Sequence, residues 1–258
     1  MPLTAQFVRN LQRFRLVTFD VTDTLLRLKE PTKQYAETAE QCGITGINKA
    51  QLERCFRQQF KLMSRTHQNF GRCTPDMSWQ SWWLQVVINT FTCMDASLSK
   101  AKLQTVAEQL LVIFRTSACW THIEGATDFV QHVREAGKCV GIISNFDPSL
   151  HQVLSAMGFN DKFDFILNSY DAGVMKPDPA IFQLALQGLN IAPDQALHIG
   201  NQLDMDYTGA RNSGWSSLLV QPKQPAPASA PEPGDPARHT YASLAEMLLA
   251  LETQAIAW

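Results

Sequence analysis

Five short runs of apolar residues constrain the fold of this 258-residue chain more than any other feature. Each run is continuously rather than alternately hydrophobic, as expected of strands that are buried on both faces of a parallel sheet. Helical patterns lie between the later runs, and glycines that can cap a helix end two of them. Strands that alternate with helices predict an α/β fold with a Rossmann-like parallel sheet. The predicted strands are residues 16–20, 139–144, 165–168, 197–200 and 217–220.

A long insertion separates the first predicted strand from the second. In it, three sets of apolar residues recur at spacings of three and four, the pattern of amphipathic helices. One set contains Trp79, Trp82 and Trp83, and their spacing favours packing between helices over a ligand-stacking site. We therefore predict an α-helical domain from residues 31–119, inserted into a core domain built from residues 1–30 and 120–258.

The C-terminal part of the chain contains a proline-rich segment. Residues 221–236 hold six of the thirteen prolines, which predicts an extended surface linker. Apolar residues near 244–251 predict a short helix after it.

Charge and hydropathy exclude some classes of partner. The net charge of -2 gives no general electrostatic reason to bind nucleic acid or an anionic membrane. The longest apolar runs are far shorter than the roughly 20 residues of a membrane-spanning helix. We therefore expect no nucleic acid and no membrane among the partners of this protein.

The six cysteines suggest a reducing compartment. They form no Cys-x-x-Cys pair and follow nothing that resembles a secretory signal, so we expect reduced thiols and no structural zinc site. This predicts a cytoplasmic protein. Mitochondria are an alternative, because Arg9, Arg13 and Arg15 precede the first acidic residue, Asp20.

Polar and charged side chains follow four of the predicted strands. Ligands of open α/β sheets bind beyond the carboxyl ends of the strands, so these residues are expected to converge. Taken singly, each has an ordinary structural explanation, such as a helix cap, a turn or a solvated charge, but their joint occurrence favours a site. The residues are Asp20 after the first strand, Ser144 and Asn145 at the second, Lys176 after the third, and Asn201, Asp204 and Asp206 after the fourth.

From about residue 16 to residue 220, this arrangement resembles the haloacid dehalogenase superfamily. The Lys-Pro-Asp-Pro sequence that begins at Lys176 and the Gly209-Ala210 pair after the acidic cluster strengthen the resemblance. The helical insertion stands where that family places its first-type cap domain. The resemblance implies that the cap closes over the site, excludes water and selects the leaving group.

The resemblance also implies a phosphatase mechanism. Asp20 would attack phosphorus and form an aspartyl-phosphate. The implied cofactor is Mg²⁺, held by Asp20, the backbone carbonyl of Thr22 and the side chains of Asn201 and Asp206.

The phosphate oxygens have their own predicted ligands. By the same resemblance, Ser144, the backbone of Asn145 and Lys176 would hold these oxygens as charge spreads over them.

Two positions depart from the phosphatase pattern. Thr22 stands where family phosphatases carry the aspartate that protonates the leaving group, which predicts a slow second half-reaction. Asp23 is an alternative acid, although strand-like alternation would aim it away. Asn201 replaces the first carboxylate of the last motif, which predicts weak Mg²⁺ binding. Asp204 is interpreted as a solvated acid near a helix N-terminus.

These observations predict a slow Mg²⁺-dependent phosphatase that acts on a small phosphorylated molecule. One alternative is a non-catalytic descendant that binds a ligand through the retained pocket. The other is a metal-independent dehalogenase, which is disfavoured because Leu203 stands where family dehalogenases carry asparagine. His198 lies inside the predicted fourth strand and is expected to be a hydrogen-bonded core histidine.

Overall fold

The computed structural model describes residues 3–221 and 236–258. It divides into two compact units. One comprises Met1–Arg27, His122–Asn145 and Phe159–Trp258, and the other comprises Leu28–Thr121 and Phe146–Gly158. The predicted linker lies almost wholly outside the described residues. The assignment of residues 31–119 to a cap domain stays a prediction.

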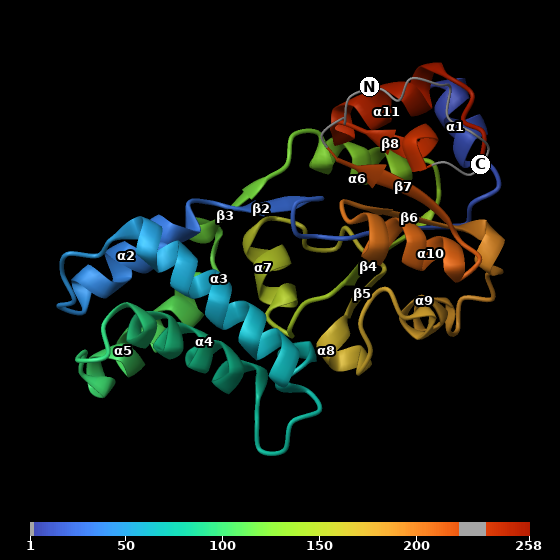
Figure 1. The fold of residues 1–258 in the computed structure, drawn as a ribbon. Coiled ribbons are helices and arrows are strands. Elements are labelled where there is room, and N and C mark those ends of the chain that lie inside the picture. The colour runs from blue at the N-terminus through green and yellow to red at the C-terminus, as the bar shows by residue number, and fades with distance from the viewer. Residues whose placement is uncertain (1–2, 222–235) are drawn as a thin grey trace. The chain divides into compact units, whose positions relative to one another are not determined.

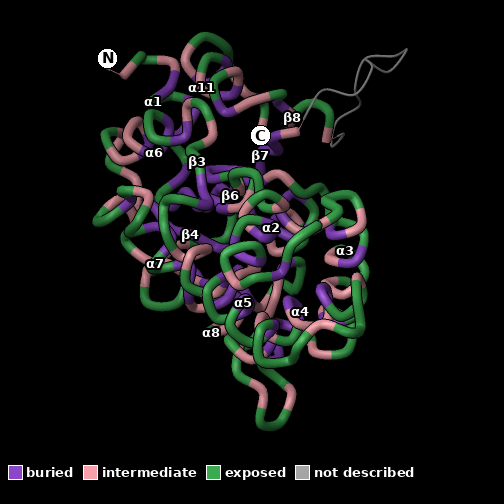
Figure 2. The backbone as a smooth tube through the Cα atoms, turned by 90° about the vertical axis from the view of Figure 1, so that its left-hand side faces the viewer, coloured by how far each residue is buried: buried purple, intermediate pink, exposed green. Residues whose placement is uncertain are grey.

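A six-stranded parallel sheet organises the first unit, with the strand order β5-β4-β1-β6-β7-β8. All five predicted strands are confirmed. The sixth strand, β8, has only two residues, too few to form a recognisable hydrophobic pattern in the sequence. Every residue of β1, β6 and β7 is buried, as continuous hydrophobicity predicted (Figure 2). The strands are β1 Leu16–Phe19, β4 Cys139–Ser144, β5 Phe165–Asn168, β6 Ala196–Gly200, β7 Ser216–Val220 and β8 Thr240–Tyr241.

Helices cover both sides of this sheet, which confirms the α/β architecture (Figure 1). On one side lie α1 (Ala5–Leu11), α6 (Ala126–Glu135) and α11 (Leu244–Thr253), the last being the predicted C-terminal helix. On the other side lie α9 (Pro179–Leu186) and α10 (Gly209–Asn212). Shorter elements are α8 Ser169–Ala172, a π-helical turn Leu203–Thr208, and the 3-10 turns Pro193–Gln195 and Pro236–His239.

The second unit is helical. Its core includes Tyr35, Leu52, Phe91 and Val106, which come from four different helices. The tryptophan pattern is confirmed as helix packing, because Trp82 is buried against the helices that precede it. The helices are α2 Pro31–Gln41, α3 Lys49–Thr66, α4 Trp79–Met94, α5 Lys100–Ile113 and α7 Leu150–Ala156, with 3-10 turns Asn69–Gly71 and Ser117–Cys119. The short strands β2 (Leu26–Leu28) and β3 (Trp120–His122) pair where the chain passes between the units.

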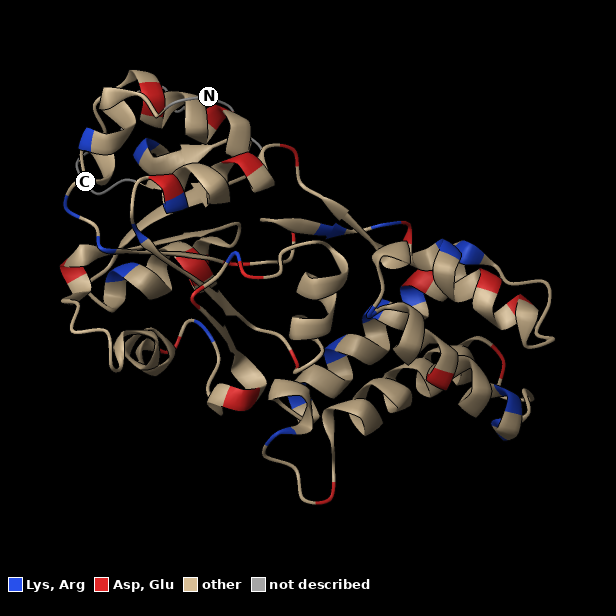
Figure 3. Cartoon of the chain, turned by 180° about the vertical axis from the view of Figure 1, so that it is seen from behind, with Lys and Arg blue, Asp and Glu red and all other residues tan. Residues whose placement is uncertain are grey.

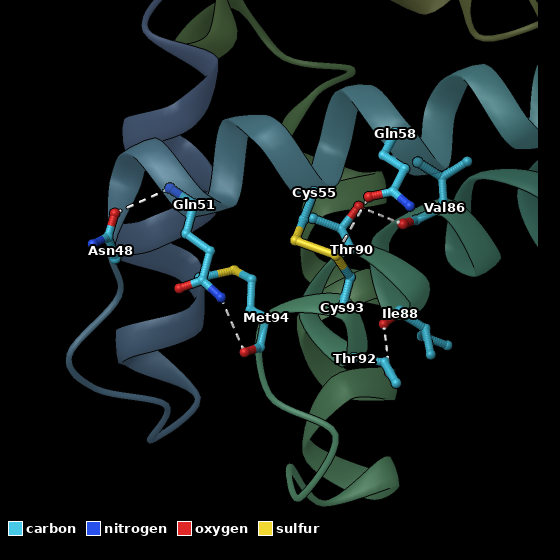
Figure 4. Close-up of a disulfide and its surroundings, with 10 residues drawn as sticks. All are labelled: Asn48, Gln51, Cys55, Gln58, Val86, Ile88, Thr90, Thr92, Cys93 and Met94. Atoms are coloured by element: carbon cyan, nitrogen blue, oxygen red, sulfur yellow. Dashed lines mark hydrogen bonds between the residues drawn. A yellow bond between two sulfur atoms is a disulfide. The ribbon is translucent and has the colours of Figure 1, made fainter.

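A disulfide joins Cys55 on α3 to Cys93 on α4 (Figure 4). The expectation that all six cysteines are reduced is therefore wrong for this pair. The two residues are 38 positions apart in the sequence, so no spacing motif marked them, but packing of α3 against α4 brings their Cα atoms to 5.9 Å. The other four, Cys42, Cys73, Cys119 and Cys139, are free thiols.

The surface carries charges of both signs. Lys and Arg are interspersed with Asp and Glu over the helices and loops (Figure 3), in keeping with the small net charge. Within the described residues, no helix has both the length and the apolar character needed to cross a membrane.

Candidate active site

The parallel register brings three strand ends to one edge of the sheet. Phe19, the last residue of β1, pairs with Ile142 of β4 on one side and Ile199 of β6 on the other. Asp20 therefore leaves the sheet beside the ends of β4 and β6. Its backbone N–H still donates to the carbonyl of Ile199 at 2.9 Å, which fixes the start of the loop. The predicted convergence at this edge follows from the register alone.

Asp20 is buried, with 6% of its surface exposed, and two donors hold one of its carboxylate oxygens. Ser144 Oγ donates to Oδ1 at 3.0 Å and Lys176 Nζ donates to the same oxygen at 2.8 Å. Among the described residues, no hydrogen bond reaches Oδ2. Burial raises the pKa of Asp20 above its usual value, and the positive charge of Lys176 opposes that rise. The carboxylate is thus oriented by one oxygen, which leaves the other for a ligand or a reaction.

Lys176 has an acceptor for each of its three ammonium protons. Besides Asp20, Nζ donates to Asp206 Oδ1 at 2.6 Å and to the Ile143 carbonyl at 2.7 Å. Burial alone would lower the pKa of Lys176, but the two carboxylates outweigh burial and raise it. Lys176 is therefore a positive charge held next to Asp20, with all three of its ammonium protons in hydrogen bonds.

The side chain of Asn145 fixes the backbone of Lys176. Its Oδ1 accepts from the Lys176 N–H at 2.7 Å, and its Nδ2 donates to the Lys176 carbonyl at 2.9 Å. Two residues later, Asp178 caps α9 by accepting from Ala180 N, and Pro179 occupies the first turn of that helix. The Lys-Pro-Asp-Pro sequence therefore starts a helix and delivers Lys176 to the site.

Asp206 accepts four hydrogen bonds. Its Oδ1 accepts from Lys176 Nζ and, at 3.1 Å, from His198 Nε2, while Oδ2 accepts from the N–H groups of Asn201 and Gln202 at 3.0 and 2.9 Å. Burial would raise the pKa of Asp206, but the charge of Lys176 and the bond from His198 hold it far below its usual value. Four donors match the lone pairs of a carboxylate, so Asp206 is a buried anchor for its neighbours.

Gly200 makes room for this anchor. A Cβ atom at Gly200 would overlap the carboxyl group of Asp206. We expect Gly200→Ala to lower the free energy of unfolding by about 1–3 kcal/mol, a typical cost of overpacking, as measured by urea denaturation. In an Asp206→Gly background the added methyl should cost much less, because the whole side chain that it overlaps, Cβ included, is gone. Equal losses in both backgrounds would contradict this explanation.

The remaining predicted residues lie on the turns beside Asp20. Thr22 is partly exposed and forms a β-bridge with Leu26, which closes the turn after β1. Asp23 has a φ of 58°, a left-handed value, and its carboxylate pairs with the exposed Arg27 at 2.9 Å. This pairing agrees with the expectation that Asp23 is aimed away from the site. Asp204 is exposed, as expected of a solvated acid.

The amide of Asn201 faces this turn. Thr24 Oγ1 donates to Asn201 Oδ1 at 3.5 Å, a long hydrogen bond that leaves the oxygen only weakly engaged.

Sequence reasoning missed two residues of the network. His198 is a fully buried and bonded core histidine, as predicted, but its bond to Asp206 was not foreseen. Thr18 of β1 lies opposite His198 in the sheet, and its Oγ1 is 2.9 Å from His198 Nδ1. The sequence did contain a signal for these two residues. Thr18 and His198 are polar residues inside otherwise apolar strands, and each stands two positions before a residue next to the site, Asp20 and Gly200 respectively.

The donor chemistry around Asp20 fits a magnesium ion with few protein ligands. The described residues hold no group of three or more His, Cys, Asp or Glu placed to bind a metal. Mg²⁺ needs only one or two carboxylates when water and substrate phosphate complete its shell. Asp20, Asp206 and Lys176 together carry one excess negative charge, which repels a phosphate group unless a cation compensates. Oδ2 of Asp20 and the side-chain oxygen of Asn201 are oxygen ligands of the kind that Mg²⁺ prefers.

Comparison with known proteins identifies the family. The family model of haloacid dehalogenase-like hydrolases matches residues 14–214. This chain belongs to the haloacid dehalogenase-like hydrolases. The resemblance inferred from the strand ends is thereby confirmed.

Curated relatives of this hydrolase share most of its length. It is 40% identical to the rhythmically expressed gene 2 protein of Drosophila melanogaster, covering 84% of this chain and 86% of that one. It is 37% identical to the human haloacid dehalogenase-like hydrolase domain-containing protein 3, covering 93% of this chain and 94% of that one.

Solved structures share the fold. A dehalogenase with an intermediate complex has a TM-score of 0.67 at 19% identity, covering 94% of this chain and 99% of that one. A Bacillus subtilis hydrolase of this family, YfnB, bound to magnesium, has a TM-score of 0.65 at 19% identity, covering 93% and 99%. A phosphatase of the family from Thermococcus onnurineus has a TM-score of 0.59 at 20% identity, covering 94% and 100%. Phosphatases and dehalogenases thus both share this fold.

Proposed function

We propose that this hydrolase is a slow Mg²⁺-dependent phosphatase that acts on a small phosphorylated molecule through an aspartyl-phosphate on Asp20. The observation that carries the proposal is the state of the Asp20 carboxylate. Ser144 and Lys176 hold Oδ1, and Oδ2 has no partner among the described residues. A buried carboxylate fixed by one oxygen is suited to nucleophilic attack by the other.

The residues that would hold Mg²⁺ are Asp20, the backbone carbonyl of Thr22 and the side chain of Asn201. When bound, the ion supplies positive charge that allows a phosphate to approach a carboxylate. We propose that Asp206 contributes through Lys176 instead of as a direct ligand, because four protein donors already occupy its oxygens.

The first half-reaction is attack by Oδ2 of Asp20 on phosphorus, with cleavage of the bond to the leaving-group oxygen. We propose that the backbone N–H of Asn145 holds a phosphate oxygen as charge spreads over it, and that the Ser144 hydroxyl does the same by turning its proton from Asp20 Oδ1 to the phosphate. Lys176 contributes its charge, since its protons are already bonded to Asp20, Asp206 and Ile143. In the second half-reaction water attacks the phosphorus and frees Asp20. Thr22 offers no carboxylate to activate that water, so we expect this step to be slow.

The charge pattern supports a small substrate. Basic residues are interspersed with acidic ones in Figure 3 instead of gathering into a stripe for a polyanion. We propose the cytoplasm as the location, with mitochondria as the alternative. The Cys55–Cys93 disulfide is the observation that counts against a reducing compartment.

A screen tests the proposed function. Purified protein is incubated with Mg²⁺ and a panel of small phosphate esters, beside the Asp20→Asn variant, and released phosphate is measured. A short-chain 2-haloacid, without metal, is included in the panel. We expect phosphate release that the variant lacks. Halide release alone would favour a dehalogenase, and no product from any compound would favour a non-catalytic binding protein.

Asn201 gives a prediction about the metal. We expect Asn201→Asp to tighten Mg²⁺ binding about tenfold or more, because it adds a second carboxylate ligand, as measured by calorimetric titration. The matched control is Asn190→Asp, which adds the same charge next to Arg15, before the amino end of β1. It should leave the affinity nearly unchanged. Equal or tighter binding by the natural protein would remove Asn201 from the metal shell.

A further inference from the structure

A row of polar side chains crosses the buried sheet at the level of His198. Thr18 of β1, His198 of β6 and Ser217 of β7 are partners in the strand register, and all three are fully buried. Ser217 Oγ donates to the His198 carbonyl at 3.0 Å, and the Phe182 ring packs edge-on against the imidazole at 5.5 Å between centroids. The imidazole is therefore confined by its neighbours, and both of its nitrogens have partners.

The contacts define one tautomer of His198. Lys176 and two backbone N–H groups donate to the Asp206 carboxylate, so Asp206 is an acceptor and His198 Nε2 carries the proton that it shares with Oδ1. A neutral imidazole with its proton on Nε2 leaves Nδ1 as an acceptor, which suits the Thr18 hydroxyl 2.9 Å away, and burial, which lowers the pKa of His198, favours this neutral form. The hydroxyl of Thr18 then donates to Nδ1. A directed chain of hydrogen bonds runs from Thr18 through His198 to Asp206.

We propose that His198 is a positioning residue that orients the Asp206 carboxylate so that Lys176 stays under Asp20. The backbone N–H groups of Asn201 and Gln202 hold only Oδ2 of Asp206. Oδ1 is shared between His198 and Lys176, so the rotation of the carboxylate depends on both. Without His198, Lys176 alone holds Asp206 Oδ1, so the carboxylate can turn about Oδ2 together with the ammonium group, which then shifts from its place between the two carboxylates. Thr18 supports this role by donating to Nδ1 of His198, which helps to hold the imidazole in place.

The kinetic consequence rests on the proposed phosphatase function. If Lys176 is misplaced, its positive charge no longer stabilises the attack of Asp20 on phosphorus as well. The groups that bind the rest of the substrate are unchanged. We expect His198→Leu, which keeps bulk but removes the donor, to lower kcat about 10–100-fold, the usual cost of losing an outer-shell partner. KM should change little. His198→Gln retains an N–H donor and should restore most of the loss.

A second measurement does not depend on activity. The Lys176 ammonium is buried with three acceptors, so its protons should exchange slowly enough to give a ¹⁵N-resolved NMR signal. We expect this signal to persist in His198→Gln and to broaden or vanish in His198→Leu. Long-range ¹H–¹⁵N spectra of the unmodified protein should show the Nε2–H tautomer of His198, and Thr18→Val, which removes the partner of Nδ1, should shift the Nδ1 resonance.

Ser217→Ala separates positioning from simple packing. It removes the hydrogen bonds of Ser217 Oγ to the backbone carbonyls of His198 at 3.0 Å and Asp206 at 3.5 Å, neither of which reaches the Asp206 carboxylate. It should lower stability without altering the Lys176 signal or kcat. Three results would each overturn the proposal. They are an equal loss of kcat in His198→Leu and His198→Gln, an unaltered Lys176 signal in His198→Leu, and an Nδ1–H tautomer of His198 in the unmodified protein. If no variant and no natural protein turns over phosphate, the proposed function fails, and the Lys176 signal still decides the role of His198.

Discussion

Replacing Thr22 by aspartate is expected to raise the turnover of phosphate esters by about 10–10³-fold. A carboxylate at this position can protonate the leaving group and then activate water, whereas a threonine hydroxyl does neither well near neutral pH. The gain should fall short of the full contribution of a general acid, because Asn201 still lacks a charge. Steady-state rates with alkyl, aryl and acyl phosphates measure the effect.

The substrate classes provide an internal control for Thr22→Asp. Aryl and acyl groups leave without protonation, so the natural protein should handle them far better than alkyl esters. The aspartate variant should narrow that difference. Asparagine has a similar size to aspartate but no acidic group, so Thr22→Asn should not raise the turnover. A gain in Thr22→Asn as large as in Thr22→Asp would show that the acid is not the cause.

Removing the Asp206 carboxylate is expected to destabilise the first unit by about 3–5 kcal/mol, the usual loss when one partner of a buried ion pair is deleted. Asp206→Ala leaves the ammonium of Lys176 with one carboxylate instead of two and strips the acceptor from two backbone N–H groups. Urea denaturation measures the loss. The control is Asp204→Ala on the same turn, which is exposed and should change stability by no more than about 0.5 kcal/mol.

The destabilisation should depend on pH in a defined direction. The pKa of Asp206 is lower in the folded protein than in the unfolded chain, so its contribution is present above the unfolded value of about 4. That contribution is lost as the pH falls through the folded value. The difference between the natural protein and Asp206→Ala should therefore be full at pH 7 and shrink below about pH 4. A difference that grows on acidification would contradict the assignment of an ionised Asp206.

The strands and the edge at which the site lies could be predicted from the sequence, because burial on both faces leaves a plain hydrophobic signal. The parallel register then places Asp20 and Ser144 beside each other without further information. What could not be predicted was which atoms meet. The bonds of Lys176 to Asp20, Asp206 and Ile143 were not foreseen, and its contact with phosphate stays a prediction.

The other surprises came from contacts between residues that are distant in the sequence. Thr18 and His198 carry no motif, and only the neighbouring positions of β1 and β6 bring their side chains together. The Cys55–Cys93 pair likewise depends on how α3 packs against α4. Helix periodicity reveals which face of a helix is buried, but it does not reveal the partner of that face.

Nucleophilic catalysis by Asp20 can be measured directly by acid-quench detection of phosphate on that residue. Protein with Mg²⁺ is mixed with ³²P-labelled acetyl phosphate and quenched in acid, and the labelled protein is counted beside the Asp20→Asn variant. Because the second half-reaction is expected to limit turnover, phospho-protein should accumulate in the natural protein and be absent from Asp20→Asn. Absence of label from the natural protein, or equal label in both, would contradict nucleophilic catalysis by Asp20.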